Sequence, residues 1–182
     1  MWEAYINGTV PVGAVIVDPG GEVVACGLNR IFDGTVDGQL ASTRLAHAEV
    51  NALVQLGSDR TYEDFHLYTA LEPCHLCLAA TIAARVGTLH YAARDRYGGA
   101  VGKLLPSADH LAHPMNIAGP LREVAGRLPE TLLVAHVLWR QPDGEVARFY
   151  ERIDPAIVAI ARTLPAPDAG ATLEDAFAAL TH

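Results

Sequence analysis

The stretch FHLYTALEPCHLCLAATIAARVGTLHYA, residues 65–92, decides the fold because it predicts a strand, a helix and a second strand in succession. Residues 65–71 mix aromatic and β-branched side chains, and Pro73 ends this strand. Residues 74–85 are rich in alanine and predict a helix, and a further strand is expected over 88–92. This alternation of strand and helix is typical of α/β proteins.

Upstream, the sequence predicts a β-hairpin, a loop and a helix. Residues 11–17, PVGAVIV, form a continuous β-branched run that is typical of a buried strand. Residues 18–21, DPGG, have turn chemistry, and 22–27 predict the second strand of the hairpin. Residues 31–44 are rich in Gly, Asp, Thr and Ser and predict a loop, whereas 45–56 favour a helix that stops at a glycine.

Downstream, the sequence predicts a fifth strand over residues 131–139 and helices over 145–152 and 155–164. A last helix is expected to start at Thr172, which opens a Thr-x-x-Asp capping pattern. Strands and helices alternate along the chain, so we expect an α/β layer architecture with helices on both faces of the sheet.

The composition is that of one compact domain. The 182 residues are 51% hydrophobic and 19% charged, which is enough apolar material for a core. We expect a domain over residues 1–150 and a helical tail over 151–182 that packs on the domain or on a dimer partner. No apolar run approaches the ~20 residues of a membrane span, and the N-terminus lacks the pattern of a secretion signal. A cytoplasmic location is the default expectation.

The charge balance disfavours a large polyanionic partner. Thirteen basic residues against 21 acidic ones give a formal net charge of -8, and Lys103 is the one lysine. Proteins that bind nucleic acid gain affinity from basic patches that neutralise phosphates. A small-molecule partner is therefore favoured, although Arg85, Arg94 and Arg96 leave room for a local basic patch.

The three cysteines do not suggest a disulfide framework, because their number is odd and no secretion signal is visible. Cys74 and Cys77 form a C-x-x-C, which in a cytosolic protein indicates a redox pair or half of a metal site. Cys26 lies in the apolar stretch VVAC, so we expect a buried, inert thiol there.

His47 and the two C-x-x-C cysteines match the needs of a catalytic zinc ion, which has three protein ligands and one open position for water. Cys74 and Cys77 are three residues apart at a predicted helix start and project to the same side. The helix N-terminus also stabilises thiolates. His75 would be a fourth ligand by count, but its place between the cysteines makes closure on the same metal awkward.

Glu49 suits a role as an acid–base group better than a role as a ligand. It is two residues from His47, and residues two apart do not share a helix face. Zinc lowers the pKa of a bound water from 15.7 to about 7, and a nearby carboxylate can accept its proton and return it to a substrate nitrogen. The chemistry implied is attack of hydroxide on an electron-poor carbon, with an amine leaving.

The motifs His47-Ala-Glu49 and Pro73-Cys-His-Leu-Cys77 follow the order H-x-E…P-C-x-x-C of zinc deaminases. Together with Pro11-Val-Gly-Ala-Val15, Asn29-Arg30 and Ala93-Arg-Asp95, they make the chain similar to the cytidine and deoxycytidylate deaminase superfamily. More narrowly, it resembles the branch of tRNA-adenosine, guanine and cytosine deaminases, over about residues 8–140.

This resemblance implies a three-layer α/β/α sandwich with a five-stranded mixed sheet, usually assembled as a homodimer. It also implies that His47, Cys74 and Cys77 bind zinc and that Glu49 shuttles protons. The positions that correspond to substrate-binding ones are Asn29, Ala48, Glu72 and Asp95, with Ala48 and Glu72 acting through their backbone.

Two readings outside catalysis stay open. A structural zinc module would need a fourth Cys or His and would leave Glu49 without a role. A redox C-x-x-C protein would leave His47 and Glu49 unexplained.

The substrate is open as well. A small nucleobase or nucleoside is favoured over tRNA, because tRNA requires phosphate contacts that an acidic chain with a single lysine supplies poorly. A riboflavin-pathway pyrimidine is a third option. The loop 32–43 and the tail 150–182 lie outside the strong resemblance, and we expect them to set substrate choice.

Overall fold

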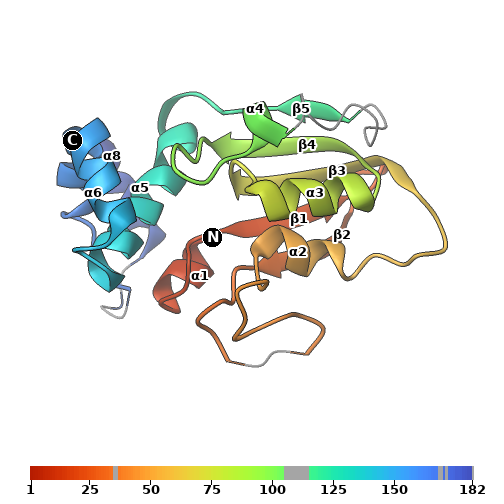
Figure 1. The fold of residues 1–182 in the computed structure, drawn as a ribbon, viewed down its shortest axis with the longest axis horizontal. Coiled ribbons are helices and arrows are strands. Elements are labelled where there is room, and N and C mark those ends of the chain that lie inside the picture. Colours follow the sequence, from red (N-terminus) through yellow and green to blue (C-terminus); the bar gives the residue numbers. More distant parts are fainter. Residues whose placement is uncertain (35–36, 105–114, 168–169, 171, 182) are drawn as a thin grey trace.

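The computed structural model describes residues 1–34, 37–104, 115–167, 170 and 172–181, and side chains throughout these ranges except at 104, 123, 124 and 181. Within them, eight helices and five strands follow one another along the chain (Figure 1). None of the described helices combines the length and the apolar character that crossing a bilayer requires.

The five strands form one mixed sheet in the order β2-β1-β3-β4-β5. Its strands are β1 (Gly13–Val17), β2 (Val23–Leu28), β3 (Tyr62–Leu71), β4 (Val86–Ala93) and β5 (Asn116–Ala118). β1 runs antiparallel to β2 and β3, whereas β3, β4 and β5 are parallel. The expected α/β fold with a five-stranded mixed sheet is confirmed, and so is the β-hairpin.

One face of the sheet is covered by α2 (Ala48–Leu53) and α3 (His75–Ala83), which lie side by side across it (Figure 1). The central strand β3 alternates accordingly, and Phe65, Leu67 and Leu71 point into the core beneath these helices. Because α2 and α3 both start at the same edge of the sheet, their first residues come together there.

Gly27 on β2 allows α2 to approach the sheet. A Cβ atom at this position would lie 2.5 Å from the Ala52 nitrogen and closer still to the carbonyl oxygen of Ala48. Both partners are helix backbone, which cannot swing aside. A glycine is therefore required at Gly27 for the start of α2 to lie where it does.

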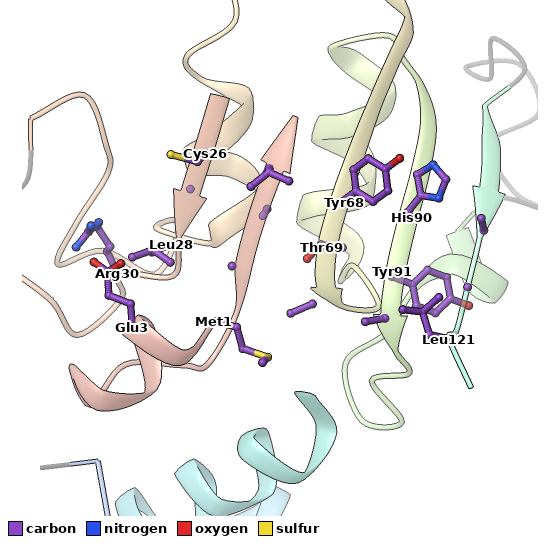
Figure 2. Close-up of a pocket in the computed structure, with 18 of the residues that line it drawn as sticks. Met1, Glu3, Cys26, Leu28, Arg30, Tyr68, Thr69, His90, Tyr91 and Leu121 are labelled. Carbon is purple, nitrogen blue, oxygen red and sulfur yellow. The ribbon is translucent and has the colours of Figure 1, made fainter. Parts of the chain in front are cut away.

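The opposite face of the sheet bears a cavity of about 730 Å³ (Figure 2). One row of paired residues crosses four strands on this face and consists of Cys26, Val15, Tyr68 and His90. Cys26 is exposed, so the prediction of a buried thiol was wrong. The physical reason is that β2 is an edge strand whose apolar stretch alternates between the covered face and this open one.

The C-terminal helices gather beyond one end of the sheet, together with α1 (Trp2–Ile6) (Figure 1). They are α5 (Glu123–Arg140), α6 (Glu145–Ile153), α7 (Pro155–Ala161) and α8 (Leu173–Thr181). α5 contacts β3 and β4 on one side and the three following helices on the other. The helices share a second hydrophobic core, centred on Leu132, Val134 and Tyr150. The short α4 (Val101–Leu104) lies beside α3.

The prediction of a strand over residues 131–139 was wrong, because these residues belong to α5. The fifth strand of the sheet is Asn116–Ala118 instead. Residues 131–139 are apolar in an almost continuous run, and periodicity does not distinguish a buried strand from a buried helix in such a run. Leu132 and Val134 are both fully buried, as expected of a helix that packs against two cores.

Candidate metal centre and its pocket

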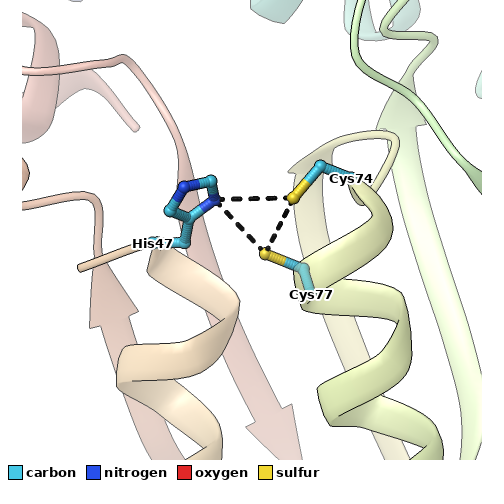
Figure 3. A group of neighbouring side chains, drawn as sticks. All are labelled: His47, Cys74 and Cys77. Carbon is cyan, nitrogen blue, oxygen red and sulfur yellow. Dashed lines mark hydrogen bonds between the residues drawn. The ribbon is translucent and has the colours of Figure 1, made fainter. Parts of the chain in front are cut away.

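Two helix starts bring His47, Cys74 and Cys77 together (Figure 3). His47 is the N-cap of α2 and Cys74 is the N-cap of α3, both with extended backbone, and Cys77 lies in the first turn of α3. The His47 Nδ1 atom is 3.7 Å from the Cys74 Sγ and 3.4 Å from the Cys77 Sγ, and the two sulfurs are 3.6 Å apart. The three atoms can therefore contact one ion.

The donor set fits zinc. One imidazole nitrogen and two cysteine sulfurs leave one of the four tetrahedral positions open, as in catalytic zinc sites. His75, at the first position of α3, is exposed and does not belong to the described group of ligand atoms. A hydrogen bond with Cys77 and a second with His47 lower the pKa of Cys74 to about 4. A thiolate, the form that binds a metal, is therefore favoured at Cys74.

Glu49 lies beside this group, in the first turn of α2, and is almost completely buried. Its Oε2 accepts a hydrogen bond of 3.2 Å from the Cys77 sulfhydryl, and its Oε1 accepts one of 3.0 Å from the Thr69 hydroxyl. Burial raises the pKa of the carboxyl. A carboxylate in this position can exchange a proton with a molecule placed at the open side of the three ligand atoms.

Thr69 is a site residue that the motifs do not single out. It lies on β3 and is buried on the face that packs under α2 and α3, where its neighbours in the alternation are Leu67 and Leu71. The signal was available in the sequence, since Thr69 is a polar residue at a position whose period-2 neighbours are apolar. The sequence did not indicate which residue packs above Thr69, so no role could be assigned to its hydroxyl.

Asn29 is buried directly after β2, and its Oδ1 accepts hydrogen bonds from the Thr9 hydroxyl and from the Ile31 N–H. The next residue, Arg30, donates its N–H to the carbonyl of Ala46, which adjoins His47. Asn29 therefore lies near the start of α2. Its oxygen is already bonded, and the described residues offer no printed partner to its NH₂ group, which can therefore contact a ligand.

Glu72 and Asp95 line a cleft of about 440 Å³ next to the cysteine-bearing turn. The Glu72 carboxylate accepts the Val101 N–H, and one Asp95 oxygen accepts the N–H groups of Tyr97 and Gly98. Burial raises the pKa of Asp95. Asn29 and Ala48 are not among the residues that line this cleft. Ala48 is buried at the start of α2, against Gly27.

The larger, 730 Å³ cavity does not contain the candidate metal centre. It lies across the sheet from His47, Cys74 and Cys77, and none of the three contributes to its lining. The metal-ligand group and the buried carboxylate, rather than the size of a cavity, locate the candidate site.

The fold and the site together define an α/β protein with a zinc centre at two helix starts. The sequence model of the cytidine and deoxycytidylate deaminase zinc-binding region matches residues 1–93. The chain therefore belongs to this family of deaminases.

Several proteins similar to this chain carry names that refer to tRNA. It is 36% identical over 126 residues to the tRNA(Ile)-lysidine synthase of Deinococcus deserti, covering 66% of this chain and 22% of that protein. It is 35% identical over 101 residues to the tRNA-specific adenosine deaminase of Rickettsia bellii, covering 54% of this chain and 66% of that protein. The chain thus spans about a fifth of the synthase and slightly less than two thirds of the deaminase.

A solved structure from work on A-to-I editing by tRNA:A34 deaminases superposes with a TM-score of 0.59 at 31% identity. The superposition covers 72% of this chain and 91% of the chain in the solved structure. This similarity supports the α/β deaminase fold independently of the motifs.

Proposed function

We propose that this protein is a zinc-dependent hydrolytic deaminase in which His47, Cys74 and Cys77 hold the metal. The observation that carries the proposal is the convergence of these three ligand atoms within 4.8 Å of one another, with the buried Glu49 in contact with Cys77. A zinc ion held there supplies a water that is acidic near neutral pH. A structural zinc module would need a fourth protein ligand, and the described residues contain no fourth member of the group.

Glu49 moves the protons in this proposal. It accepts a proton from the attacking water and donates it to the leaving nitrogen of the substrate, so that ammonia departs. Its burial and its hydrogen bond from Thr69 hold the carboxylate in one orientation. Asn29, Ala48, Glu72 and Asp95 are proposed to bind the substrate, Asn29 through its NH₂ group.

The proposed substrate is a small nucleobase or nucleoside. Two of the three arginines that left room for a basic patch are engaged in ion pairs, Arg85 with Glu63 and Arg96 with Glu130 and Asp154. The cleft that Glu72 and Asp95 line is also lined by Arg94, Arg96 and Lys103, so its own charges do not distinguish the two substrate classes. The ion-paired arginines and the net charge of -8 are the features that disfavour a phosphodiester backbone.

Adenosine in tRNA is the second candidate, and the similarity to tRNA-specific adenosine deaminases favours it. Residues 1–150 are proposed as the deaminase domain and 151–182 as a tail packed on it, in accord with the contacts of α7 and α8 with α5. A homodimer in the cytoplasm completes the proposal.

The experiment combines metal analysis with ammonia release. Purified protein should contain one zinc per chain and release ammonia from one member of a panel of free bases, nucleosides and unmodified tRNA. Glu49→Gln should keep the zinc and lose roughly 10²–10⁴-fold in turnover, the range of a general acid–base residue. Zinc without turnover on any member, or unchanged turnover in Glu49→Gln, would overturn the proposal.

A further inference from the structure

The loop between β4 and α4, residues 94–100, forms one wall of the 440 Å³ cleft and is bonded to the cysteine-bearing turn. Gly99 pairs with Cys74 as an isolated β-bridge, and Ala100 donates its N–H to the Pro73 carbonyl over 3.0 Å. Any shift of the loop would therefore change the surroundings of Cys74. What holds the loop from its other side decides the shape of the cleft.

Arg96 is the residue that bonds the loop to the C-terminal helices by ion pairs, next to Tyr97, whose ring packs edge-on against that of Phe149 on α6. Its Nε donates to the Glu130 carboxylate on α5 over 2.5 Å, and its Nη2 donates to the Asp154 carboxylate over 3.0 Å. Its guanidinium also lies over the ring of Tyr150, 5.4 Å from the centroid. One side chain of the loop thus contacts α5, α6 and the junction between α6 and α7.

The partners of Arg96 are themselves fixed. Tyr150 is fully buried and donates its hydroxyl to the same Glu130 oxygen over 3.3 Å. Asp154 caps α7, since its second oxygen accepts the Ile157 N–H over 3.0 Å. Contacts other than those with Arg96 already fix both carboxylates. The two ion pairs of Arg96 therefore cost less side-chain entropy than an ion pair between two mobile surface side chains.

We propose that Arg96 is a positioning residue, which sets the cleft wall beside Cys74 by bonding loop 94–100 to the C-terminal helices. The role of the cleft in binding substrate rests on the function proposed above. The role of Arg96 in positioning the loop does not. The helices that anchor Arg96 lie beyond residue 93, where the family match ends. The C-terminal region would thereby influence substrate choice without contacting the metal centre.

The test compares Arg96→Gln with Arg162→Gln in the zinc-loaded, full-length protein. Arg162 forms an exposed ion pair with Glu151 within the same group of helices, so its loss controls for a missing surface arginine. We expect amide hydrogen exchange in residues 96–100 to accelerate roughly tenfold in Arg96→Gln and to stay unchanged in Arg162→Gln. Zinc content should stay at one per chain in both.

A second variant, Asp154→Asn, removes one ion pair and keeps the helix cap, because asparagine caps as well as aspartate. It should accelerate exchange in residues 96–100 by an intermediate factor, which keeps the proposal testable if Arg96→Gln does not fold. With the substrate that the panel of bases, nucleosides and tRNA identifies, Arg96→Gln should raise KM by about tenfold and change kcat by less than about threefold. Arg96→Lys should restore only part of the affinity, because lysine cannot bond both carboxylates in a fork.

Exchange in residues 96–100 that equals the wild type in both Arg96→Gln and Asp154→Asn would overturn the inference. So would faster exchange confined to α6–α8, since Arg96 would then stabilise the helices and not the loop. Neither result depends on turnover, so a failure of the proposed deaminase activity would be recognised separately.

Discussion

The Thr69 hydroxyl donates a hydrogen bond of 3.0 Å to the Glu49 carboxylate, which joins the central strand of the sheet to the start of α2. Both residues are buried, so water does not compete for this contact. A carboxylate that must accept and return a proton in one place benefits from a fixed orientation. The strand under the helix thus contributes to the candidate site as directly as the two helix starts do.

Thr69→Val should therefore lower kcat by about tenfold, in line with the loss of one hydrogen bond to a charged group, while KM and zinc content stay unchanged. Valine has the shape of threonine without its hydroxyl, and Thr69→Ser should restore most of the rate. Steady-state kinetics and metal analysis check this. Thr131→Val is the control, because Thr131 is a buried threonine on α5 that bonds the Arg127 carbonyl instead. Equal rates in Thr69→Val and Thr131→Val would contradict the expectation.

Cys74→Ser and Cys77→Ser should each weaken zinc binding strongly, since each removes one of three protein ligands. Cys26→Ser should retain one zinc per chain, because Cys26 is exposed on the opposite face of the sheet. Elemental analysis after dialysis against a chelator of moderate affinity distinguishes the variants. Full zinc retention in a Cys74→Ser/Cys77→Ser double variant would remove both cysteines from the site.

Gly27→Ala should destabilise the protein by about 1–3 kcal/mol or more and lower its zinc content, because the added methyl group meets the backbone of α2. Displacement of α2 would carry His47 away from Cys74 and Cys77. Gly102→Ala, in α4, is the matched control, since a Cβ atom there has no neighbour within 4 Å among the described residues. Urea unfolding and zinc analysis of the two variants check the expectation, and equal stability of the pair would contradict it.

His136 on α5 should make stability fall in mild acid. Burial, and to a lesser extent the positive charge of Arg140, lowers its pKa to about 4. No hydrogen-bond partner of its Nδ1 is found among the described residues. An unfolded chain takes up a proton at this histidine near pH 6.5, whereas the folded protein does so only near the lowered pKa. The stability associated with neutral His136 is thus complete above about pH 6.5 and is lost as the pH falls towards 4, by up to about 3 kcal/mol.

The measurement is urea unfolding at pH 7 and pH 5 for the wild type and for His136→Phe. The aromatic replacement preserves packing against Phe32, whose ring stacks on that of His136. Loss of metal in acid affects both proteins, so the difference between them isolates the histidine. An identical decline in stability for the two proteins would contradict the assignment of the lowered pKa.

Local patterns in the sequence were sufficient for the elements and residues whose geometry is set within a few positions. Cys74 and Cys77 share a side because they are three residues apart at a helix start, and β3, α3 and β4 follow from their composition and from Pro73. The order of His47, Glu49 and the two cysteines indicated the metal group, which the structure brings within reach of one ion.

Only the tertiary structure decided which residues from distant parts of the chain meet. Thr69 and Glu49 are 20 residues apart, and Arg96 and Asp154 are 58 apart, so no local pattern connects them. The apolar run 131–139 became a helix because it packs between two cores beyond the end of the sheet, and Cys26 became exposed because its strand is at an edge. In each case the outcome depends on which residues pack together, and the periodicity of a sequence does not specify those partners.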